Sequence, residues 1–127
     1  MIWTSTLETG IKQIDDQHKE LFLQADKLLD TKNKERVPET LNFLAKYVIK
    51  HFTDEQGLHN SSKYPKAEAH KKFHTAFVEQ FNKLKTEYET AGQNLSTLIK
   101  INNTVVGWLK DHIMVHDKEF AAFYKTK

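Results

Sequence analysis

Side chains that can bind metal interrupt four otherwise apolar segments of this sequence. Two pairs recur at a spacing of four residues, His51 with Glu55 and His70 with His74. On an α-helix this spacing places both side chains on one face, about 6 Å apart along the axis. Such a pair can bind one metal ion or two neighbouring ions. The full set of candidate ligands is His18, His51, Glu55, His70, His74, His112 and Asp117.

Apolar residues at three-and-four spacing predict four helices that would position these ligands. We expect Asp15 or Asp16 to cap the first helix, which fades in the polar run 31–34. Pro38 suits the first turn of the second helix, and Gly92 the end of the third. The predicted helices cover approximately residues 15–30, 38–59, 67–91 and 96–120.

Short connections between these helices predict an all-α, up-down-up-down antiparallel four-helix bundle. We expect one domain over residues 1–127, with an irregular N-terminal arm at 1–14 and the bundle at 15–127. The candidate ligands lie near the starts of the first and third helices and near the ends of the second and fourth. In this topology those four ends meet, so all the ligands are expected in one layer of the core.

Composition excludes several classes of protein. The chain has 127 residues, and 19 Lys and Arg oppose 17 Asp and Glu, which gives no electrostatic argument for nucleic-acid binding. It has no cysteine, which excludes disulfides, zinc–thiolate sites and iron–sulfur clusters. It shows no secretion signal and no apolar stretch of about 20 residues, so we expect a cytoplasmic protein without a membrane partner.

A purely structural explanation of the polar residues is the alternative to metal binding. Any one core-facing histidine can simply be hydrogen-bonded. Glu55 is different, because a buried carboxylate without a partner costs several kcal/mol. Five histidines and two carboxylates in one layer therefore favour metal, with two octahedral ions fitting better than one tetrahedral zinc. Ligand chemistry alone allows iron, manganese or a mixed pair.

Several short motifs together resemble the hemerythrins, in particular the single-domain bacterial hemerythrin-like proteins. The resemblance covers essentially the whole chain. Its residues are Trp3 in the arm, Ile14-Asp15-Asp16-Gln17-His18, His51-Phe52-Thr53-Asp54-Glu55, Tyr64-Pro65, His70-Lys71-Lys72-Phe73-His74, Trp108-Leu109-Lys110-Asp111-His112-Ile113 and Asp117.

This resemblance implies a non-haem di-iron centre (Fe2+/Fe3+) that binds dioxygen reversibly. It implies a coordinatively full iron bound by His70, His74 and His112, and a second iron with an open position bound by His18 and His51. Glu55, Asp117 and a hydroxide or oxo group would bridge the two. Side chains within a turn of the ligands would line the dioxygen pocket, namely Leu21, Phe52, Trp108, Leu109 and Ile113.

His59 departs from the family, which commonly has methionine there. It follows Glu55 by four residues, so it either faces the pocket near the open iron or lies exposed at the end of the second helix. Our hypothesis is that a pocket-facing His59 donates to the bound oxygen ligand or binds the open iron.

His116 is an alternative to Asp117 as the second ligand from the fourth helix. His116 follows His112 by four residues, whereas Asp117 follows by five and would be rotated by about 140° on a regular helix. Because the family uses the five-residue step, we choose Asp117 and leave His116 exposed. The choice predicts a local distortion of the fourth helix, such as a π-bulge.

The expected function is that of a monomeric dioxygen carrier or store, not an enzyme. An oxygen-consuming enzyme is a possible recipient of the dioxygen. The alternatives are an oxygen or redox sensor, a di-iron enzyme or repair factor handling dioxygen, nitric oxide or iron, and a purely structural bundle.

Overall fold

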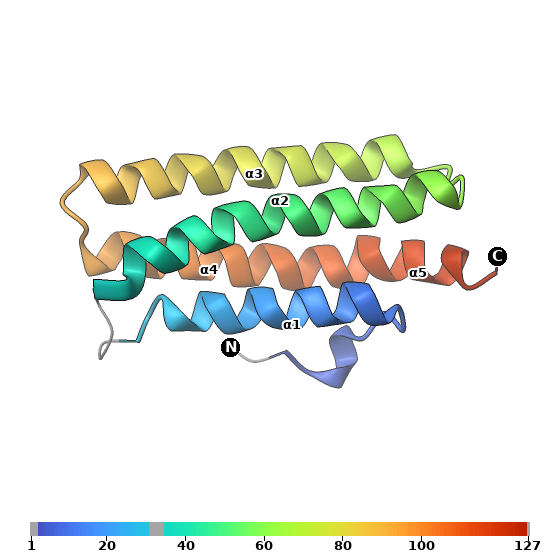
Figure 1. Ribbon diagram of the computed structural model, residues 1–127, viewed down its shortest axis with the longest axis horizontal. Coiled ribbons are helices and arrows are strands. Elements are labelled where there is room, and N and C mark those ends of the chain that lie inside the picture. The colour runs from blue at the N-terminus through green and yellow to red at the C-terminus, as the bar shows by residue number, and fades with distance from the viewer. Residues whose placement is uncertain (1–2, 31–34, 127) are drawn as a thin grey trace.

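Four long helices form an antiparallel bundle in a computed structural model that describes residues 3–30 and 35–126. Figure 1 shows the up-down-up-down order, which confirms the predicted fold. The predicted end of the first helix in the run 31–34 lies outside the described residues. The elements are η1 (Ser5–Leu7), α1 (Lys12–Lys27), α2 (Val37–Ser61), α3 (Ala67–Thr90), α4 (Leu95–His112), η3 (Ile113–Asp117) and α5 (Lys118–Tyr124).

Local signals explain most of the helix ends. Pro38 lies in the first turn of α2, where its missing N–H costs no hydrogen bond. Gly92 follows α3 with a φ of +89°, a left-handed conformation that favours glycine. Asn94 caps α4, because its side chain accepts a hydrogen bond of 2.9 Å from the Thr97 N–H.

The start of α1 differs from the prediction, because α1 begins at Lys12 and neither Asp15 nor Asp16 is its cap. Asp15 lies in the first turn and binds the incoming arm instead. Its Oδ1 accepts from the Thr9 N–H at 2.8 Å, and its Oδ2 accepts from the Gly10 N–H at 3.0 Å. The carboxylate therefore binds the segment that precedes the helix, and the helix begins at an earlier residue than predicted.

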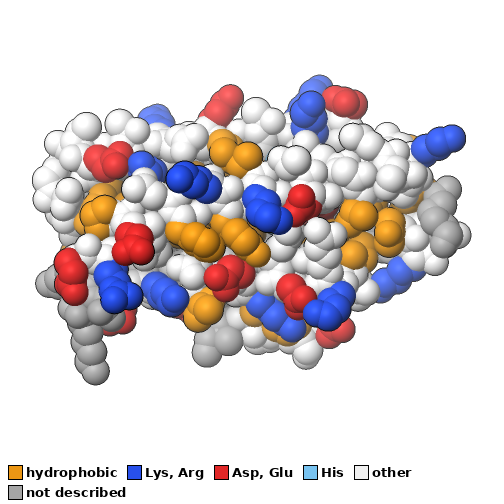
Figure 2. All heavy atoms as spheres, viewed as in Figure 1, with side chains coloured by type: hydrophobic (Ala, Val, Ile, Leu, Met, Phe, Trp, Pro, Cys, Tyr) orange, Lys and Arg blue, Asp and Glu red, His pale blue; other side chains and the backbone are white. Residues whose placement is uncertain are grey.

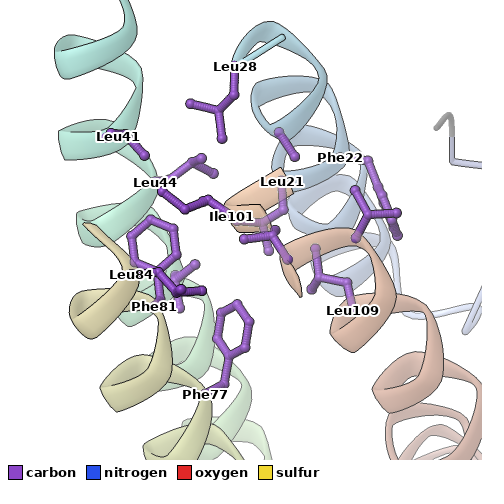
Figure 3. Close-up of a cluster of buried hydrophobic side chains, with 14 of the residues drawn as sticks. Leu21, Phe22, Leu28, Leu41, Leu44, Phe77, Phe81, Leu84, Ile101 and Leu109 are labelled. Atoms are coloured by element: carbon purple, nitrogen blue, oxygen red, sulfur yellow. The ribbon is translucent and has the colours of Figure 1, made fainter. Parts of the chain in front are cut away.

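The main hydrophobic core fills the bundle on one side of the candidate ligands. Figure 3 shows that all four helices contribute to it. Burial of each large apolar side chain contributes about 1.5–3 kcal/mol to folding. The members labelled in Figure 3, all exposed by 4% or less, are Leu21, Phe22, Leu28, Leu41, Leu44, Phe77, Phe81, Leu84, Ile101 and Leu109.

A smaller cluster of Ile14, Tyr64 and Phe120 closes the other side. On each helix the candidate ligands lie between residues of the two clusters, as His18 lies between Ile14 and Leu21. The polar layer is therefore enclosed by apolar side chains at both ends.

The outer surface carries charged side chains over the face seen in Figure 2, with hydrophobic side chains in small separate groups. Among the described residues, no helix is long and apolar enough to cross a membrane.

Candidate metal centre

The structure brings all the predicted ligands into one buried layer. Each is exposed by 4% or less, although every one of them is ionisable. They form two groups that share one carboxylate. The larger group is Glu55, His70, His74, His112 and Asp117, and the smaller group is His18, His51 and Asp117.

Three imidazoles of the larger group point their Nε2 atoms at one place. His112 Nε2 lies 2.8 Å from His70 Nε2 and 3.2 Å from His74 Nε2. With metal–ligand bonds of about 2.1 Å, neighbouring donors of an octahedral ion are about 3.0 Å apart. Both separations are those expected of neighbouring ligands of one ion, and all three nitrogens lie within 4.8 Å of one another.

Two carboxylate oxygens complete the larger group. Glu55 Oε1 lies 3.1 Å from His70 Nε2 and 3.0 Å from His74 Nε2. Asp117 Oδ1 lies 3.0 Å from His70 Nε2 and 3.2 Å from His112 Nε2. These five donors, all within 4.8 Å of one another, are enough for all but one position of an octahedral ion.

The smaller group has fewer protein donors. Asp117 turns its second oxygen, Oδ2, towards His18 Nε2 at 3.1 Å, so each oxygen of this carboxylate faces a different group. The His18 and His51 rings lie with their centroids 4.7 Å apart. With three donors against five, the His18–His51 side offers more free coordination positions.

Buried polar atoms without hydrogen bonds show that the residues fit a cation. Both oxygens of Glu55, both ring nitrogens of His18 and Oδ1 of Asp117 are buried and form no hydrogen bond of suitable geometry, although some lie 3.0–3.2 Å from another ligand atom. Each such atom costs about 1–3 kcal/mol if it stays unpaired. Because ring nitrogens and carboxylate oxygens are also the usual ligands of first-row metals, metal binding accounts for this cost.

The two carboxylates have opposite acid–base behaviour. Burial and the nearby charge of Asp117 raise the pKa of Glu55 to about 8. Burial also raises the pKa of Asp117, but its contacts with His112, His18 and His70 outweigh burial and lower that pKa well below its usual range. Without a cation the site therefore holds one ionised carboxylate, and a cation would favour ionisation of the second.

Most of the imidazoles are held neutral. Burial, reinforced by the neighbouring His18, lowers the pKa of His51 to about 3, and burial likewise lowers the pKa of His74. His70 differs, because its contacts with Asp117 and Glu55 overcome burial and raise its pKa to about 9. Neutral imidazole is the form that binds metal, so His51 and His74 are ready ligands.

The predicted distortion of the fourth helix is confirmed by a π-helical turn at Ile113–Asp117. This turn brings Asp117 into the layer despite its five-residue step from His112. His116 belongs to neither group of ligands. It is half-buried rather than exposed, with its ring stacked on Phe73 at a centroid distance of 4.2 Å.

Two glutamines contact ligand imidazoles, and the sequence analysis missed both. Gln17 Oε1 lies 2.7 Å from His51 Nδ1, and the Gln56 amide nitrogen lies 3.2 Å from His74 Nδ1. The only signal in the sequence was adjacency, since Gln17 precedes His18 and Gln56 follows Glu55. Such outer contacts orient ligand rings and fix their tautomers.

His59 is fully buried, so it is not exposed at the helix end. Its ring centroid lies 4.5 Å from that of His70 and 4.2 Å from that of Phe120. One turn beyond Glu55, the ring therefore packs between a ligand of the larger group and the smaller apolar cluster. Both ring nitrogens lack a hydrogen-bond partner.

Two of the predicted pocket residues stack directly on ligand imidazoles. The Phe52 ring lies parallel to that of His74 at a centroid distance of 3.8 Å, and Trp108 stacks on His112 at 4.3 Å. These contacts hold the imidazole planes and exclude water from them. The remaining members, Leu21, Leu109 and Ile113, are buried in the main core.

Comparison with known proteins identifies the family to which the chain belongs. A family model described as "Hemerythrin HHE cation binding domain" matches residues 9–124. The chain belongs to the hemerythrin family. A solved structure titled "Crystal structure of hemerythrin: wild-type" superimposes with a TM-score of 0.84 at 30% identity, covering 98% of this chain and 97% of the other.

Several curated hemerythrins are similar along most of their length. Bacteriohemerythrin of Pseudomonas aeruginosa is 29% identical over 92% of this chain and 76% of the relative. Bacteriohemerythrin of Clostridium acetobutylicum is 29% identical over 94% of this chain and 97% of the relative. Myohemerythrin of Theromyzon tessulatum is 36% identical over 65% of this chain and 67% of the relative. Membership of the hemerythrin family implies non-haem iron binding by this chain.

Proposed function

We propose that this hemerythrin binds dioxygen reversibly at a pair of non-haem iron ions. The observation that carries the proposal is the unequal division of donors, with five in one group, three in the other, and Asp117 shared between them. An ion held by five donors beside one held by three would leave most of its free coordination positions on the His18–His51 side, where a small ligand would bind. Asp117 would connect that side to the second ion.

The residues that would hold the two ions follow from the groups. His70, His74 and His112 would bind one ion and His18 and His51 the other, with Asp117, which faces both groups, as a bridging carboxylate. Glu55 lies in the larger group, and the family resemblance makes it the second bridging carboxylate. When bound, a ferrous pair supplies the electrons and the open coordination position that dioxygen binding requires. The five imidazoles are neutral ligands, so the protein adds little negative charge and stabilises high-valent iron only weakly.

The surrounding side chains keep water away from this layer. Leu21 and Ile113 are completely buried, and Phe52 and Trp108 cover the faces of two ligand rings. Exclusion of water and protons slows the loss of bound oxygen as a reduced product. This environment favours release of intact dioxygen, so we propose a carrier or store and not an enzyme.

The alternatives use the same iron centre differently. An oxygen or redox sensor would need a conformational response, and a di-iron enzyme or repair factor would need a further acid or base near the open position. His59 and His116 are the histidines outside the ligand groups, and both lie on the His70–His112 side. This placement favours the carrier.

We further propose that the protein acts as a monomer in the cytoplasm, where reducing conditions help to keep iron ferrous. An oxygen-consuming enzyme would receive the dioxygen.

Anaerobic loading with ferrous iron tests the proposal. We expect two irons per chain and a visible absorption band that appears in air and disappears on degassing, through repeated cycles. Two irons with a single irreversible oxidation would instead favour the enzyme or the sensor. Failure to retain metal would return the site to a structural role.

A further inference from the structure

A chain of hydrogen bonds leads from His51 in the smaller group to the surface of α2. Gln17 Oε1, on α1, lies 2.7 Å from His51 Nδ1. The amide nitrogen of the same Gln17 donates to Asp54 Oδ2 at 2.8 Å. Lys50 Nζ also donates to Asp54 Oδ2 at 2.8 Å. This series of hydrogen bonds therefore crosses from α2 to α1 and returns to α2. Only its outer members, Asp54 and Lys50, reach solvent, and the Asp54 side chain is 28% exposed.

The carboxylate at the end of this chain determines the direction of every bond in it. An ionised carboxylate only accepts hydrogen bonds, so the NH2 of the Gln17 amide must face Asp54. The carbonyl oxygen of Gln17 must then face His51. Because a carbonyl oxygen also only accepts, His51 must carry its proton on Nδ1. The lone pair is left on Nε2, the other ring nitrogen.

We propose that Asp54 is a positioning residue that acts through Gln17 to fix the tautomer of His51, and with it the ring nitrogen presented to metal. This inference rests on the proposed function, because it assigns a role at the ion with the open position. It extends the usual carboxylate–histidine–metal arrangement by one amide between the carboxylate and the imidazole.

The larger group has no equivalent device. Gln56 contacts His74 Nδ1 at 3.2 Å, and within the described residues no second hydrogen bond holds the Gln56 amide in one orientation. The larger group has five donors, so each one matters less to retention of its ion. The smaller group has three, and loss of one correctly oriented imidazole removes a large share of its ligands.

Asp54→Ala removes the acceptor that orients Gln17 and leaves the proposed ligands unchanged. Asp16→Asn is the matched control, because Asp16 forms a comparable ion pair with Lys12 four residues away, at 2.7 Å on the exposed surface of α1. In the metal-free protein, ring nitrogen NMR shifts of His51 report its tautomer directly. We expect the Nδ1–H form in the wild type and in Asp16→Asn, and a mixture of both tautomers in Asp54→Ala.

Metal affinity is the second measurement, made anaerobically by competition between the protein and a chelator for ferrous iron. We expect Asp54→Ala to raise the dissociation constant of one of the two iron ions by about 10- to 100-fold and to leave that of the other unchanged. An unchanged His51 tautomer together with two unchanged affinities would overturn the inference. Neither measurement uses dioxygen, so the inference and the proposed function can fail separately.

Discussion

Asp117 Oδ1 lies 3.2 Å from His112 Nε2, although five residues separate them along the fourth helix. On a regular α-helix the fifth residue points about 140° away from the first. The π-helical turn at Ile113–Asp117 removes this difference and turns the carboxylate inward. Such turns are rare and occur often at functional sites. The backbone of the fourth helix is therefore shaped to place a shared carboxylate between the two groups of ligands.

Asp117→Ala should abolish the pair of ions. Without the carboxylate that faces both groups, we expect at most one tightly bound iron per chain and no reversible oxygen spectrum. The measurement is iron content after anaerobic loading and gel filtration. His116→Ala is the matched control, because His116 lies on the same turn outside both groups, and it should retain two irons. Two irons and full oxygen affinity in Asp117→Ala would refute the assignment of this residue.

Removal of metal should lower the stability of the bundle. Bound metal stabilises the native state by mass action, by about 4 kcal/mol for each site at a free metal concentration a thousand times the dissociation constant. We expect a higher melting temperature for the anaerobic ferrous protein than for the chelator-treated protein, measured by circular dichroism. His116→Ala should show the same increase. Identical melting curves with and without metal would contradict metal binding in this layer.

His59→Met should stabilise the metal-free protein. Both ring nitrogens of His59 are buried without partners, and an unpaired buried polar group costs about 1–3 kcal/mol. Methionine is of similar size and adapts well to irregular apolar surroundings such as those near Phe120. The measurement is the free energy of unfolding in urea, with His116→Met as control, because this substitution removes no unpaired buried nitrogen and should not stabilise the protein.

His59→Met also tests the remaining part of our hypothesis about this residue. Because His59 packs beside His70, a ligand of the larger group, we expect the rate of autoxidation to remain close to that of the wild type. A large change in autoxidation or in oxygen affinity would restore a direct role for His59 at the open position.

Acid should destabilise the metal-free protein. Burial lowers the pKa of His51 to about 3 and that of His59 to about 4, and it also lowers those of His74 and His112. In the unfolded chain these imidazoles protonate near pH 6.5. Below that pH the unfolded state binds more protons, so each group lowers the free energy of unfolding by about 1.4 kcal/mol per pH unit until its folded pKa is reached.

Glu55 acts in the opposite direction, because its folded pKa of about 8 lies above the unfolded value of 4.5. Between these values the folded state binds more protons, and acidification stabilises it. His70, with a pKa of about 9, is charged in both states below pH 6.5 and contributes no slope there. From pH 6.5 to 4.5 the imidazoles of His51, His59 and His74 together outweigh the one carboxyl of Glu55. The urea concentration at the midpoint of unfolding should fall as the pH is lowered over this range in the presence of chelator. A midpoint that rises as the pH is lowered would contradict the prediction.

The amino-acid pattern alone predicted the four helices, their antiparallel order and the shared layer of ligands. The physical reason is that periodic burial and short connections constrain the topology strongly, so ligand positions near helix ends translate directly into proximity. Once the family resemblance had favoured Asp117 over His116, the five-residue step from His112 also predicted a distortion, because no regular helix places both residues on one face.

Contacts between helices were decided only by the tertiary structure. The contact between Gln17 and Asp54 joins residues 37 positions apart, and nothing in either local sequence specifies it. The neighbours of His59 depend on how far along the bundle α2 meets Phe120, and the start of α1 depends on the arm that Asp15 binds. Periodicity determines which face of a helix is buried, but the rotation and axial shift of packed helices determine which side chains meet there.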